Sequence, residues 1–60
     1  MQFRIILIDT DRGRTSHVLN LAGTPEVGDL LDLDGVEILV HHVTDSSRQE
    51  IAGVVVAGRP

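Results

Sequence analysis

The sequence of 60 residues contains no cysteine, no tryptophan, no tyrosine and no lysine, and its one aromatic residue is Phe3. Without cysteine the chain forms neither disulfides nor thiolate metal sites. Without an aromatic set, the core has to be built from isoleucine, leucine and valine, and few rings are available to stack on nucleobases. A domain of this size buries only about 60% of the surface that its unfolded chain exposes. We therefore expect a single small domain, residues 1–60, in which packing and self-association replace covalent staples.

Positive charge is scarce: five arginines stand against nine acidic residues, which gives a formal net charge of −4. Proteins that bind a duplex usually present a basic face, so this balance argues against nucleic acid as the partner. The longest apolar run, residues 5–8, is too short to span a membrane, and the N-terminus lacks the pattern of a secretory signal. We expect no membrane contact and a cytoplasmic location.

Apolar residues recur with a period of two, or in short runs between turn residues, and nowhere keep the spacing of an amphipathic helix. The first two strands are expected at about residues 3–10 and 14–21, separated by an Asp-Arg-Gly connection at residues 11–13. A three-residue connection that ends in glycine fits a hairpin, because glycine adopts the left-handed conformation without steric cost. We expect Thr10 to pair with Arg14.

This hairpin carries apolar side chains on both sides of the sheet. In the expected register Ile5 faces Leu19 on one side, and Ile6 faces Val18 on the other side. A sheet with one face in water does not place such side chains there, so the second side is covered by barrel closure or forms an interface. The candidate interface residues are Ile6, Ile8, Val18, Leu30 and Leu39.

A loop with two glycines and one proline, residues 22–29, leads to a second hairpin. Its strands are expected at residues 30–33 and 36–43, joined by Asp-Gly, which suits a type I′ turn because both central residues need positive φ. The expected pairs are Leu33 with Val36, Leu31 with Ile38, and Asp32 with Glu37. Two opposed carboxylates repel each other mildly, so Asp32 and Glu37 mark the solvent side.

The last third of the chain returns to a strand after a polar segment. Ser47 and Glu50 have the spacing of a helix capping box, so we expect at most one short 3₁₀ or helical turn near residues 46–50. The β-branched run of residues 51–57 then forms a strand that closes the sheet against the first one. Gly53 within this run indicates a bulge or a close backbone crossing.

The second hairpin carries a family resemblance. The pattern Pro-x-x-Gly-Asp at residues 25–29, the Asp-Gly turn at residues 34–35 and the Val-x-x-Val return at residues 40–43 resemble small, uncharacterised SH3-like barrel proteins of bacteria and phages. The resemblance covers about a third of the chain and implies an all-β fold: a small five-stranded SH3-like barrel or a strongly bent antiparallel sheet. Leu39 stands where those proteins often carry tyrosine, so the aromatic peptide groove is not implied and no functional residue is transferred.

The residues that carry chemistry do not form a recognisable site in the sequence. His41 and His42 are neighbours on a strand, so they are expected to point to opposite faces, and His17 is far away in the chain. Ser16 and His17 are separated in the same way. The Asp9/Asp11 and Asp32/Asp34 pairs are better explained by turns than by acid–base or calcium chemistry. We predict no catalytic, cofactor-binding or metal-binding residues, and no enzyme.

Two classes of function remain open. The favoured one is a non-enzymatic module that binds a protein, or a second copy of itself as a homo-oligomer, through its apolar sheet face. The alternative is a nucleic-acid- or ribosome-associated small barrel, whose contact residues would be Arg4, Arg12 and Arg14. An acidic inhibitor of a host protein, encoded by a phage or mobile element, is also compatible with the charge.

Overall fold

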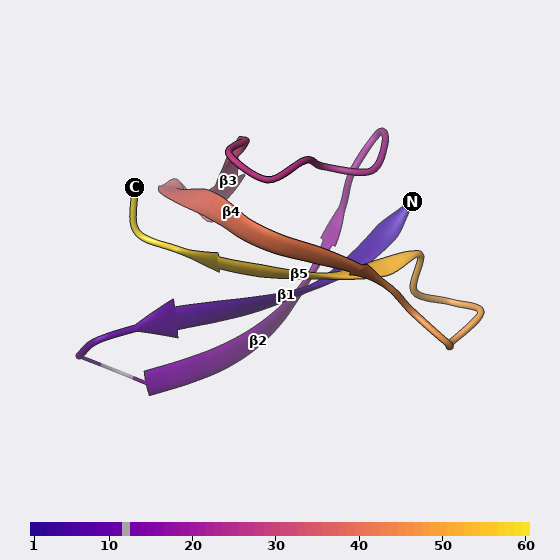
Figure 1. Cartoon of the computed structure of the whole chain (residues 1–60), viewed down its shortest axis with the longest axis horizontal. Helices are drawn as coiled ribbons and strands as arrows, with labels where there is room; N and C mark the ends of the chain where they lie inside the picture. The colour runs from indigo at the N-terminus through magenta and orange to yellow at the C-terminus, as the bar shows by residue number, and fades with distance from the viewer. Residues whose placement is uncertain (12) are drawn as a thin grey trace.

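The computed structural model describes residues 1–11 and 13–60, and its regular elements are all strands (Figure 1). The strands are β1 (Gln2–Asp9), β2 (Gly13–Asn20), β3 (Leu30–Leu33), β4 (Val36–Asp45) and β5 (Gly53–Gly58). Each coincides with one of the β-branched or alternating runs of the sequence. The predicted all-β fold with five strands is confirmed.

The strands form one strongly curled, half-barrel sheet in the order β2-β1-β5-β4-β3 (Figure 1). The first and last strands are neighbours, as predicted, but they run parallel to each other. The sheet is therefore mixed rather than antiparallel, because β5 runs antiparallel to β4 and then lies beside a strand of its own direction. The two edges of the half-barrel are β2 and β3.

The first hairpin forms in a register that differs from the predicted one by two positions. Asp9 pairs with Gly13, and Ile6 pairs with Ser16 rather than with Val18. The Asp9 side chain accepts the backbone N–H of Asp11 at 2.8 Å, so the chain begins to turn earlier than expected. A shift by an even number leaves every side chain on its predicted face, because side chains alternate along a strand.

The second hairpin forms as predicted. Asp34 and Gly35 have φ of 51° and 84°, the positive values that a type I′ turn requires. All three expected pairs are present, including Asp32 opposite Glu37 on the exposed side. The Asp32 carboxylate also accepts the Gly35 N–H at 2.8 Å, which fastens the turn.

One face of the curled sheet forms the core, and Phe3 lies at its centre with 1% of its surface exposed. Its other fully buried side chains are Ile5, Ile38, Val40, Val55 and Ala57. Because inward residues of β1, β5 and β4 stand in register, the core continues across the three central strands.

The polar segment after β4, for which the sequence allowed at most one short helical turn, forms none. In the described residues, positions 47–50 are bends, and the Ser46 hydroxyl accepts the Arg48 N–H at 3.1 Å. This serine turn takes the place of the capping box. Ile51, three residues after Arg48, is already buried, which leaves no room for a helical turn before β5.

The close backbone crossing predicted at Gly53 is present, with the backbone of Thr44 and the ring of Phe3. A Cβ atom here would lie 2.9 Å from the Thr44 carbonyl oxygen and 3.2 Å from the Phe3 ring. The irregularity of the sheet is instead a register shift in β4 between Val40 and His42. Because Gly53 has no side chain, the Phe3 ring has room to pack against it in the core.

We predict that Gly53→Ala destabilises the fold by about 1–3 kcal/mol, because the new methyl group overlaps backbone that cannot move away freely. The matched control is Gly23→Ala, where a Cβ would meet nothing within 4 Å and φ is not positive; it should change stability by about 0.5 kcal/mol or less. Urea unfolding of the three proteins measures the difference, and equal midpoints for the two variants would contradict the proposed packing.

Candidate functional site

The face of the sheet opposite the core, called the outer face here, is defined by the strand register. Residues paired across neighbouring strands share a face, so the outer residues can be followed from β2 to β3. Its apolar members are Ile6, Ile8, Val18, Leu30, Leu39, Val54 and Val56. Its polar members are Gln2, Arg4, Arg14, Ser16, Asn20, Asp32, Glu37, His42 and Thr44.

All five candidate interface residues predicted from the sequence lie on this outer face. Curling of the sheet leaves Ile8 and Val18 each 51% exposed and Leu30 53% exposed. Ile6 and Leu39 are half-buried. Barrel closure therefore does not cover this side of the sheet in the isolated chain.

The sequence did not identify Val54 and Val56 as members of the outer face. Both stand in an unbroken apolar run, which reads as a strand buried on both sides. The parallel pairing places them beside Arg4 and Ile6. They are half-buried, and on their other side they pair with His42 and Thr44 of β4.

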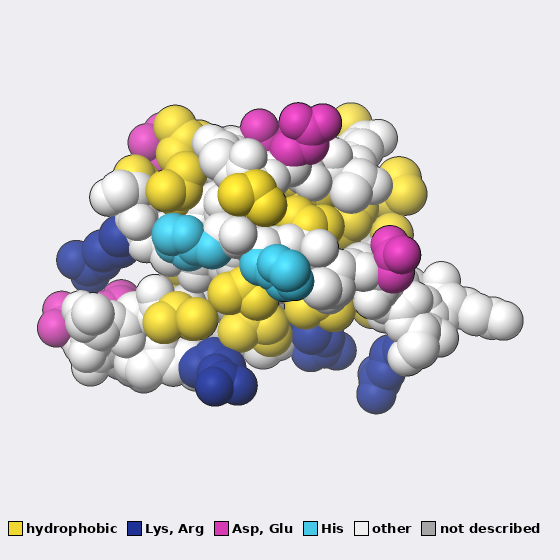
Figure 2. Space-filling model, in the orientation of Figure 1, with side chains coloured by type: hydrophobic (Ala, Val, Ile, Leu, Met, Phe, Trp, Pro, Cys, Tyr) yellow, Lys and Arg dark blue, Asp and Glu magenta, His cyan; other side chains and the backbone are white. Residues whose placement is uncertain are grey.

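Two of the three predicted arginines are placed by the structure. Arg4 and Arg14 lie on the outer face, and Arg4 donates to the Ser16 hydroxyl at 3.0 Å. Arg12 lies outside the described residues. Figure 2 shows histidine side chains among apolar ones on the visible face, with arginine side chains mainly along its lower margin. Phe3, the one ring that could stack on a base, is buried in the core.

The histidines do not come together on a metal. In the part of the chain that the structure describes, no group of three or more histidine, cysteine or acidic side chains is arranged to hold a metal ion. The register shift in β4 places His41 against Gly58, where a Cβ atom would lie 2.9 Å from the His41 ring. His17 instead shares a hydrogen bond of 3.0 Å with the Thr15 hydroxyl, its neighbour on the inner side of β2.

The inner side of the sheet ends in a cavity of about 470 Å³ between the two hairpins. Its apolar wall includes Leu7, Leu33 and Ile38, the last two of which also belong to the core. Thr15 and His17 of the edge strand β2 line one side. Sequence reasoning missed this cavity, because it forms where residues distant in the chain meet.

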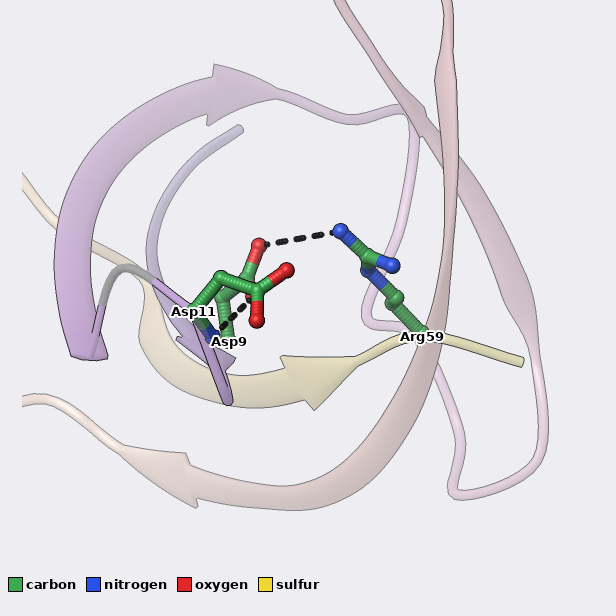
Figure 3. Close-up of polar contacts among 3 residues, drawn as sticks. All are labelled: Asp9, Asp11 and Arg59. Carbon is green, nitrogen blue, oxygen red and sulfur yellow. Dashed lines mark hydrogen bonds and ion pairs between the residues drawn. The ribbon is translucent and has the colours of Figure 1, made fainter.

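Charged groups surround the opening of this cavity. Asp9 and Asp11 come from the first turn, Asp34 from the second, and Arg59 from the segment after β5. Figure 3 shows Arg59 reaching across the curl of the sheet toward Asp9, with its guanidinium nitrogen 3.4 Å from the carboxylate oxygen. The Asp11 N–H donates to the same Asp9 side chain. The opening therefore holds three carboxylates and one described cation.

No protein-family model matches this sequence, and no curated protein or solved structure matches it either. Among residues 1–11 and 13–60 there is no helix with the length and apolar character needed to cross a membrane. The function is therefore argued from the residues and their geometry.

We predict that Arg59→Ala changes the free energy of unfolding by about 1 kcal/mol or less, because the Arg59 side chain is 70% exposed and ion pairs in solvent contribute little. Thermal unfolding at low and moderate salt measures this. A loss of several kcal/mol would show that Arg59 is a structural component of the half-barrel rather than a surface group over the cavity.

Proposed function

We propose that this chain is a non-enzymatic interaction module whose outer face binds a protein, either a second copy of the chain or another protein. The observation that carries the proposal is the exposure of Ile8, Val18 and Leu30 on one face of the sheet. Scattered apolar residues are ordinary on a protein surface, but these three lie on one face of the sheet, on which Ile6 pairs with Val56 and Leu30 pairs with Leu39.

The energy available on this face is sufficient for association. Covering the exposed half of an isoleucine, valine or leucine side chain contributes roughly 1 kcal/mol. Several such side chains together contribute a few kcal/mol, the range of weak, roughly millimolar association. Arg4 and Arg14 on one side, and Asp32 and Glu37 on the other, would orient the partner.

The proposal keeps the features expected from the sequence: a small SH3-like barrel acting in the cytoplasm, without a cofactor. Nucleic acid has weaker support as a partner, since Arg4 and Arg14 lie among apolar residues and Phe3 is buried. If the chain is an acidic inhibitor of a host protein, the same outer face would bind a basic surface of that protein.

We predict that Ile8→Asp and Val18→Asp weaken association by tenfold or more, because each places a charge where an apolar side chain would be desolvated. Sedimentation velocity from micromolar to millimolar concentration measures self-association. A photo-crosslinking amino acid at position 18, in cells that express the protein, detects contact with any other protein.

The control is Val27, which is 66% exposed in the loop before β3 and does not belong to the outer face. Val27→Asp should leave association unchanged, and a crosslinker at position 27 should give little product. A protein that stays monomeric throughout and crosslinks equally from positions 18 and 27 would contradict the proposal. Retention on DNA or RNA that is lost in Arg4→Ala with Arg14→Ala would favour the nucleic-acid alternative.

A further inference from the structure

The edge strand β2 has unpaired backbone groups along its length. The Leu21 N–H donates to the Met1 carbonyl at 2.7 Å, and this pair continues the register of β1 with β2. Hydrogen-bonded and non-hydrogen-bonded pairs alternate in an antiparallel ladder, so the odd-numbered residues of β2 bond to β1. The even-numbered residues direct their N–H and C=O groups away from β1, toward the open side of the sheet; they are Arg14, Ser16, Val18 and Asn20.

This edge has few of the features that usually prevent another strand from pairing. β2 has eight residues without proline, lysine or an acidic side chain, its permanent charge is Arg14, and its register with β1 is unbroken. The opposite edge, β3, has only four residues and carries Asp32. Of the two edges, β2 is therefore the one that can accept an additional strand.

The cavity described above adjoins this edge. Thr15 and His17, which line the cavity, are the inward-facing residues of β2. In a strand added beside β2, every second side chain would lie next to them, on the inner side of the sheet. The cavity volume of about 470 Å³ and its apolar wall of Leu7, Leu33 and Ile38 suit the aliphatic part of a side chain.

The charges at the opening determine which terminal group the bound side chain should carry. Asp9, Asp11 and Asp34 line it, and Arg59 supplies its described positive charge. Three carboxylates against one described cation give this lining an acidic balance. An aliphatic stem that ends in an ammonium or guanidinium group matches both the apolar wall and the carboxylates.

We propose that β2 and the adjoining cavity bind an extended segment of a partner protein that carries a lysine or arginine. The backbone of the segment extends the sheet at β2. Its basic side chain enters the cavity past Thr15 and His17 and reaches the carboxylates of Asp11 and Asp34. Arg59, which is exposed and paired at 3.4 Å, moves aside. This mode gives affinity through the backbone and specificity through one pocket. It uses the edge of β2 and the inner side of the sheet, whereas the function proposed above uses the outer face.

The test uses a soluble, capped peptide of alternating threonine and valine with one central arginine, and its twin with glutamate in place of arginine. Titration into the isotopically labelled protein is followed by amide NMR. The arginine peptide should shift the amides of Arg14, Ser16 and Val18 and slow their hydrogen exchange. The glutamate twin should bind at least tenfold more weakly. In an added strand only every second peptide N–H points toward β2. N-methylation of those amides should abolish binding, and N-methylation of the amides that point away from β2 should not.

Variants of the protein locate the basic side chain. Asp34→Asn should weaken the arginine peptide about two- to fivefold, as expected for one partly exposed charge. This variant keeps the turn, because Asn-Gly also suits type I′ geometry. Arg59→Ala should tighten binding about twofold or more, since it removes the competing cation. Asp45→Asn is the matched control and should have no effect, because Asp45 pairs with Gly53 at the other end of the sheet.

Three results would overturn the proposal. The first is no binding of either peptide at millimolar concentration. The second is equal binding of the arginine and glutamate peptides, with Asp34→Asn behaving as the parent protein. The third is a set of shifts confined to outer-face residues of the central strands, such as Ile6 and Val56, without β2, which would leave the function proposed for the outer face intact.

Discussion

The fold depends on the parallel contact between β1 and β5, in which Phe3 packs against Gly53. This contact joins the first and last strands, and because β5 also pairs with β4, it joins the first hairpin to the second. It is also the centre of the core, where Ile5 and Val55 are fully buried side by side. Because a short chain has little other core, the curl of the sheet, its outer face and its free edges all follow from this one pairing.

Local signals in the sequence determined much of the fold. Asp34 and Gly35 require one turn type, and that turn determined every pair of the second hairpin. The first hairpin was less certain, since Asp9 competes for the backbone of Asp11 and moves the turn. The parallel direction of β5 beside β1 has no local signal, because it results from the packing of residues that are far apart in the chain.

The outer face could be predicted in part, because side chains alternate between the two faces of a strand. Alternation placed Ile6, Ile8 and Val18 on one side, and an even register error did not move them. Val54 and Val56 were missed because an unbroken apolar run does not reveal which residues face outward. The cavity could not be predicted, since Leu7, Leu33 and Arg59 meet there only after the sheet curls.

Leu33 and Ile38 have two roles, because they belong to the core and also form the wall of the cavity. A group that fills the cavity would therefore add contacts to side chains that already hold the hairpins together. In thermodynamic terms, occupancy and folding are linked, and a bound chain would resist unfolding more than a free one. A domain with so small a core would then reach its full rigidity only in a complex.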